Sequence, residues 1–211
     1  MSANLMSLAR SGGKFLKLFG DRKMMKLLPY DAEVEYLEST GTQWIDTGYT
    51  GSQCPYFSLD VRPLITNVDA GMFGAYPNGY TVQQYLGKWR WFEFGWTLTN
   101  IPVDITRTTN VTKNANGWFV DGEITKTSSS STDRWNLSLV LFGINANDGV
   151  KRGTKSLRVN QLSLFDKNSS LVADFIPIRR GNIGYMFDRV SGQLFGNKGT
   201  GEFIIGPDKT I

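Results

Sequence analysis

The chain has 211 residues, with 13% aromatic side chains, 23 glycines and 7 prolines, a composition typical of one large β-domain with tight turns. It contains no histidine and one cysteine, which excludes Ser–His–Asp and Cys–His nucleophiles and the commonest zinc ligand sets. Its net charge of +4 is uneven, because residues 1–28 carry +5 and the rest of the chain −1. The larger part therefore presents no excess positive charge to a nucleic acid, and we expect no nucleic-acid partner.

Residues 1–28 are expected to form a basic amphipathic arm. Apolar side chains recur there at helical spacing with basic side chains opposite, and the candidates for docking onto a partner are Leu5, Leu8, Phe15, Phe19, Lys14 and Lys17. Three interpretations stay open: a weakly helical extension, an arm that folds onto a protein partner, and a helix on a membrane surface. We expect no signal peptide and no transmembrane segment, and translation could begin at Met1 or Met25.

Residues 29–211 are expected to form a β-sandwich, because short apolar runs alternate with turn signals throughout. Residues 56–62 alternate apolar and polar side chains and stop at Pro63. Residues 156–166 predict a second such strand, with its odd-numbered side chains on one face and its even-numbered side chains on the other.

Two hairpins are predicted inside this module. Residues 80–86 and 89–96 would pair around Gly87-Lys88, and residues 117–125 would turn at Asp121-Gly122. The first hairpin is rich in aromatic residues, and sugar rings stack on exposed tryptophan faces. Most tryptophans of a β-sandwich lie in its core, so for these side chains we favour packing in the core or between subunits over contact with a ligand. The candidate glycan ligands are Trp89, Trp91, Arg90, Tyr80, Gln83 and Trp96.

The loop at 145–149 is either a plain turn or a weak calcium site, since Ca²⁺ takes six to eight oxygen ligands. Its candidate ligands are Asn145, Asn147, Asp148 and Asp69. No other cofactor is expected.

One acidic pattern, Glu33-x-Glu35-x-x-Glu38, is similar to the catalytic strand of retaining glucanases, which hold two carboxylates about 5–5.5 Å apart. The pattern has glutamate where that family has a central aspartate, and it lies on the first strand of the module. We therefore expect a solvated strand, no catalytic residue and no enzyme.

The two ends of the module carry a family resemblance. Residues 36–49 read YLESTGTQWIDTGY, and residues 184–201 read GYMFDRVSGQLFGNKGTG before the closing run at 203–207. Asp188 is expected to accept hydrogen bonds from backbone amides and Gly192 to take a positive φ, with the last strand returning beside the first. Together the segments resemble the concanavalin A-like, or laminin G-like, jelly-roll modules of gut bacteria and their phages.

This resemblance covers residues 30–207 and implies an all-β jelly-roll sandwich of two antiparallel sheets. With the arm, it predicts a non-catalytic surface module, and the main prediction is a homo-oligomeric phage virion component. Such a capsid decoration, fibre or tail part would bind a glycan or another virion protein. The alternative is a bacterial cell-surface or secreted carbohydrate-binding module, and a glycosidase using the acidic strand is a distant third.

Overall fold

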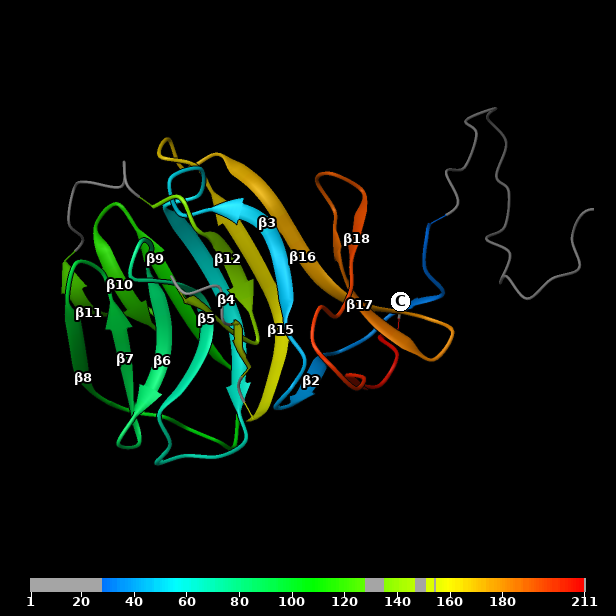
Figure 1. Cartoon of the computed structure of the whole chain (residues 1–211), viewed down its shortest axis with the longest axis horizontal. Coiled ribbons are helices and arrows are strands. Elements are labelled where there is room, and N and C mark those ends of the chain that lie inside the picture. Colours follow the sequence, from blue (N-terminus) through cyan, green and yellow to red (C-terminus); the bar gives the residue numbers. More distant parts are fainter. Residues whose placement is uncertain (1–27, 128–134, 147–150, 154, 211) are drawn as a thin grey trace, which may run out of the picture.

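A computed structural model of the chain describes residues 28–127, 135–146, 151–153 and 155–210. Every regular element in these ranges is a β-strand, and the strands form two sheets that pack as a sandwich (Figure 1). The predicted all-β sandwich of antiparallel sheets is therefore confirmed. In the same ranges, no helix is long and apolar enough to cross a membrane. The predicted arm, with Leu5, Leu8, Lys14, Phe15, Lys17 and Phe19, lies outside the described residues.

The first sheet has the strand order β11-β10-β9-β4-β15-β16-β17-β18, and all its pairs are antiparallel. Three short strands complete it, because β1 pairs with β16, and β2 pairs with both β15 and β19. Its strands are β1 (Ala32–Glu33), β2 (Leu37–Thr40), β4 (Tyr56–Pro63), β9 (Thr109–Asn114), β10 (Gly117–Val120), β11 (Glu123–Thr127), β15 (Lys155–Phe165), β16 (Leu171–Arg180), β17 (Ile183–Asp188), β18 (Gln193–Phe195) and β19 (Ile204–Ile205).

The second sheet has the order β14-β13-β5-β6-β7-β8, with β12 pairing β3 and β5. Its pairs are antiparallel except for β5 and β13, which run parallel. Its strands are β3 (Ile45–Thr50), β5 (Ala70–Tyr76), β6 (Thr81–Tyr85), β7 (Lys88–Phe92), β8 (Trp96–Pro102), β12 (Ser138–Leu141), β13 (Gly143–Ala146) and β14 (Lys151–Gly153).

The core lies between the two sheets and follows the alternation of the strands. In β4, Phe57, Leu59 and Val61 are buried and the intervening side chains are half-buried, as the sequence predicts. In β15 the prediction of one continuous face is wrong. Leu157 and Val159 are buried, but after a register shift between Val159 and Gln161 the buried side chains are Leu162 and Leu164. A bulge adds one residue and so exchanges the two faces of a strand.

The ends of the module meet, as predicted. Strand β19 pairs antiparallel with β2, and Lys209 N donates to the Glu33 carbonyl. The buried Asp188 carboxylate accepts the backbone N–H groups of Asp174, Val190 and Ser191 at 2.8, 3.0 and 3.2 Å. Gly192 follows at φ 74°. The closing segment is therefore a turn built around one buried carboxylate.

Both predicted hairpins form. Asp121 and Gly122 occupy the turn between β10 and β11 with φ of 48° and 84°. Strands β6 and β7 also pair, but Tyr85 is opposite Lys88, so the turn residues are Leu86 and Gly87 and not Gly87 and Lys88. Leu86 and Gly87 both have a positive φ, as a two-residue turn that matches the twist of the hairpin strands requires.

Candidate functional site

Two of the three tryptophans named as candidate glycan ligands lie in the core. Trp89 and Trp91 are fully buried, with ring centroids 5.9 Å apart, and Trp91 stacks on Trp118 at 5.2 Å. The Trp91 indole donates to Thr125 Oγ1 at 2.9 Å, across the sandwich. For these two rings the core packing that we favoured is confirmed and contact with a glycan is wrong, because alternation along β7 turns both toward the other sheet.

Tyr80 and Gln83 are buried as well. The Tyr80 hydroxyl donates to the Cys54 carbonyl at 2.8 Å, and burial raises the pKa of Tyr80 well above 10. Tyr80 is therefore a core residue, and its prediction as a glycan ligand is also corrected. Gln83 lies on the opposite face of the sheet, where it donates to Thr81 and accepts from Arg90. Gln83 therefore helps to hold the side chain of Arg90 at the surface.

The face of β5–β8 that points away from the core carries an aromatic platform, which we define as Tyr76, Phe92 and Trp96. Tyr76 stacks on Trp96 with centroids 5.4 Å apart, and Phe92 meets both rings edge-on at 4.8 and 5.0 Å. Trp96 is 47% exposed, whereas Tyr76 and Phe92 are half-buried. The result is an aromatic surface held in place by mutual contact.

Arg90 borders this platform and is held from several sides. Its guanidinium carbon lies 4.4 Å from the Tyr85 ring centroid and 4.3 Å from that of Trp96, within the range of cation–π attraction. Nη2 donates to Asp69 and to Gln83, and the side chain is 14% exposed. Its Nε is buried and has no partner among the described residues. A rigid cation with carboxylate and amide neighbours thus adjoins an apolar platform.

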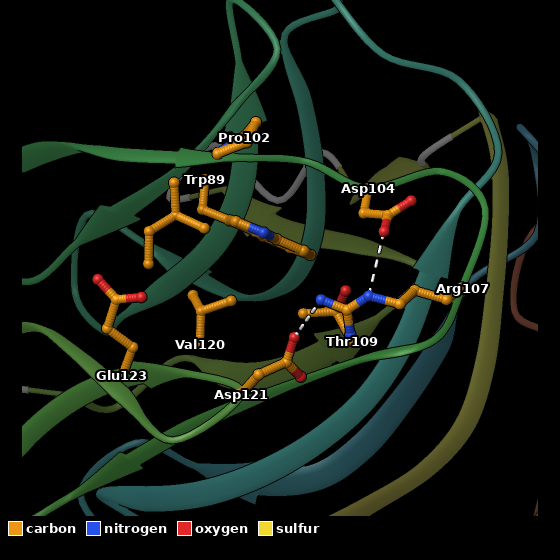
Figure 2. A pocket seen from close by; sticks show the side chains of 9 residues that line it. Trp89, Pro102, Asp104, Arg107, Thr109, Val120, Asp121 and Glu123 are labelled. Atoms are coloured by element: carbon orange, nitrogen blue, oxygen red, sulfur yellow. Dashed lines mark hydrogen bonds and ion pairs between the residues drawn. The ribbon is translucent and has the colours of Figure 1, made fainter.

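A separate pocket of about 170 Å³ opens at the end of the sandwich where β8 approaches the β10–β11 hairpin (Figure 2). Arg107 bridges two carboxylates in it, donating to Asp104 at 3.1 Å and to Asp121 at 2.7 Å. Hydrogen bonds from Thr106, followed by the charge of Arg107, lower the pKa of Asp104. Trp89, Ile101, Pro102, Thr109, Val120 and Glu123 complete the lining.

The calcium candidates are not assembled into a site. Asp69 pairs with Arg90, and Asn145 donates to the carbonyl and hydroxyl of Ser138, while Asn147 and Asp148 lie outside the described residues. Within the described ranges no cluster of three or more Asp, Glu, Cys or His side chains could hold a metal ion. Calcium binding stays a prediction.

The acidic pattern near the start is held in structural contacts. Glu38 accepts from Arg158 Nε at 2.7 Å, and Glu33 accepts from the Tyr30 hydroxyl at 3.2 Å. Glu35 is exposed between β1 and β2. None of the three carboxylates lines the pocket in Figure 2.

Sequence reasoning missed most of the residues that these two surfaces use. Tyr76 and Phe92 belong to the aromatic-rich stretch but were not singled out, because their face of the sheet depends on the register. The pocket combines β7, the segment 101–109 and the 120–123 turn, and no local motif joins them. Within this lining, the feature that a local sequence pattern predicts is the Asp121-Gly122 turn.

No protein-family model matches the chain, and no curated protein matches its sequence. Among solved structures, the chain is similar to a crystal structure of a protein from Bacteroides ovatus that is provisionally named a carbohydrate-binding protein. The TM-score is 0.56 at 11% identity, and the match covers 84% of this chain and 61% of the other. At this identity the likeness shows a shared fold, and this chain spans less than two thirds of the other protein's length.

Proposed function

We propose that this chain is a non-catalytic module that binds carbohydrate on the aromatic platform of β5–β8. The observation that carries the proposal is the exposed Trp96 ring, backed by Tyr76 and Phe92 and adjoining the fixed Arg90 guanidinium. The fold shared with a provisionally named carbohydrate-binding protein supports the same class of function.

The chemistry of the platform suits a sugar better than a purely apolar ligand. The C–H face of a pyranose ring is apolar and matches an aromatic face, while its hydroxyls need hydrogen-bond partners at the edge. Arg90 can donate to a hydroxyl and the exposed Asp69 can accept from one. An open surface of this kind contacts one face of the ligand, so we expect weak binding of single sugars and tighter binding of chains.

These observations support the cell-surface or secreted module better than the virion component that was the main prediction. The named function of the structural neighbour is carbohydrate binding, and nothing in the comparisons points to a virion. Three parts of the proposal rest on the sequence: docking through residues 1–28, oligomer formation, and location at the cell surface or outside the cell.

The proposal is tested by screening the chain on a glycan array and titrating the best oligosaccharide by calorimetry. Trp96→Ala removes the exposed ring, and we expect it to weaken binding by roughly tenfold or more, the usual effect of losing an aromatic hot spot. Ile183→Ala is the matched control, because Ile183 is 49% exposed but lies on β17 of the other sheet.

Two results would contradict the proposal. One is an array on which no glycan is retained, and the other is equal affinity of Trp96→Ala and the unaltered chain. Release of new reducing ends from the bound glycan would overturn the non-catalytic part.

A further inference from the structure

Strand β8 ends the second sheet and lacks the features that protect the other sheet edges. In the described ranges β8 pairs with β7 alone. The other strands that pair on one side only, in the same ranges, fall into two groups. Strands β3, β11 and β14 carry charged residues, which are Asp46, Glu123, Lys126, Lys151 and Arg152, whereas β1, β18 and β19 have only two or three residues. Charge and short length both discourage pairing with another chain, and the seven residues of β8 have neither.

Exposed apolar side chains gather along the same side of the sandwich. They are Phe94, Trp96, Leu98 and Ile124, which are 44 to 56% exposed. The first three belong to β8 and the turn before it, and Ile124 lies on β11. Lys126 Nζ on β11 donates to the Glu93 carbonyl at 3.2 Å, so the edges of the two sheets lie together, at the left of Figure 1. A gathering of exposed apolar side chains on a soluble protein marks an interaction surface.

The regular part of the β8 edge is short and centred on Thr97. Residues 96–98 pair one to one with β7. Beyond Leu98 the register with β7 shifts, and the Ile101 N–H is accepted by Thr99 Oγ1 at 3.2 Å. A partner strand would therefore find a regular edge at residues 96–98.

The composition of this edge fits a second copy of the chain as its partner. When a strand pairs antiparallel with its own copy about a twofold axis, the residue at the axis meets itself. A charged residue near the axis would then lie close to the same charge, which destabilises a pair of strands. A different protein could instead match a charged edge with opposite charges. The absence of charged residues from β8 is therefore what self-pairing requires.

We propose that two copies of this chain associate through β8, with the two strands antiparallel and the twofold axis at Thr97. In this register Trp96 of each copy lies opposite Leu98 of the other, so two aromatic–aliphatic pairs form across the axis. Phe94 and Ile124 border the contact. The second sheets of the two copies become one continuous sheet. The inference goes beyond the proposed function and does not depend on glycan binding.

Sedimentation of the full chain at increasing concentration tests the association. We expect a species with twice the mass of one chain. Leu98→Lys replaces an exposed apolar side chain and brings two like charges close across the axis, so we expect the dissociation constant of the dimer to rise about tenfold or more. Ile183→Lys is the matched control, because Ile183 is equally exposed but lies on β17 of the other sheet, and this variant should dimerise like the unaltered chain.

The position of the axis has its own test. Residues directly opposite each other in an antiparallel pair have Cα atoms about 4.5–5.5 Å apart, a distance that a disulfide can span. Thr97→Cys should therefore give a cross-linked dimer when a thiol oxidant is added, and Ile183→Cys should not. The native Cys54 is buried and does not compete.

Three results would overturn the inference. The first is a chain that stays monomeric at about 100 µM, since association depends on the concentration of the protomer. The second is a dimer of undiminished affinity in Leu98→Lys, which would place the contact elsewhere, for example on residues 1–28. The third is a dimer that Thr97→Cys does not cross-link. Circular dichroism of each variant verifies that it folds.

Discussion

Replacing Glu93 by glutamine tests a buried charge network that the fold holds between its two sheets. The side chains of Lys113 and Glu93 are both fully buried, with Nζ 3.3 Å from Oε1. Lys113 also donates to the Pro55 carbonyl at 3.0 Å, and Glu93 accepts from the Trp118 indole at 2.7 Å. Burial lowers the pKa of Lys113, and the negative charge of Glu93 opposes that shift.

The expected loss of unfolding free energy follows from the charges that the substitution leaves without a partner. Glutamine keeps the volume of Glu93 and can still accept the Trp118 hydrogen bond, but it leaves the buried ammonium of Lys113, and the partly exposed one of Lys126 at 3.8 Å, without a counter-charge. Breaking a buried pair from one side costs about 3–5 kcal/mol. Four aromatic rings lie with centroids 5.1 to 6.0 Å from Nζ and offset part of this loss: Tyr56, Tyr80, Trp118 and Trp135. We therefore expect about 3 kcal/mol.

The assay is equilibrium unfolding in urea. With a slope of about 1–3 kcal/mol per molar urea, the midpoint of Glu93→Gln should fall by roughly 1–3 M. The double variant Lys113→Met, Glu93→Gln removes the stranded charge, and we expect it to be more stable than Glu93→Gln alone. A loss below about 1 kcal/mol in the single variant, or a double variant no better than the sum of its singles, would refute the reasoning.

Three further predictions concern single residues. Asp188→Ala leaves three backbone N–H groups without their acceptor and should lower the free energy of unfolding by at least about 2 kcal/mol in urea, whereas full stability would contradict the role of this carboxylate. A Cβ on Gly74 would lie 1.9 Å from the Tyr80 carbonyl oxygen, so Gly74→Ala should yield little folded protein by circular dichroism; in the control Gly122→Ala nothing lies within 4 Å and only strain of about 1–2 kcal/mol is expected. Burial raises the pKa of Cys54 from 9.0 to about 12, so the folded chain keeps the thiol proton where the unfolded chain has lost it. Stability should therefore fall as pH rises from 9 toward 12, and less steeply in Cys54→Ala; rapid labelling of the native thiol at pH 8 would contradict its burial.

The pairing of strands was predictable wherever local chemistry decides it. The alternation in residues 56–62 places Phe57, Leu59 and Val61 in the core, and the Asp121-Gly122 dipeptide forms its turn. Asp188 was identified because aspartate followed by a positive-φ glycine is a local turn signal. In residues 156–166 the same reasoning failed after Val159, because the bulge there depends on the register with β4, a strand nearly a hundred residues earlier.

By itself, the sequence determined an all-β sandwich, the residues that turn the chain, the join between its two ends and the exclusion of histidine-dependent chemistry. These properties depend on residue type and on neighbours close in the chain. Only the tertiary structure decided which aromatic rings are available to a ligand. Trp89 and Trp96 have the same chemistry, but the strand register buries one between the sheets and leaves the other 47% exposed. The pocket that Thr109 lines could not be predicted from the sequence either, because its lining comes from three segments that meet only in the folded chain.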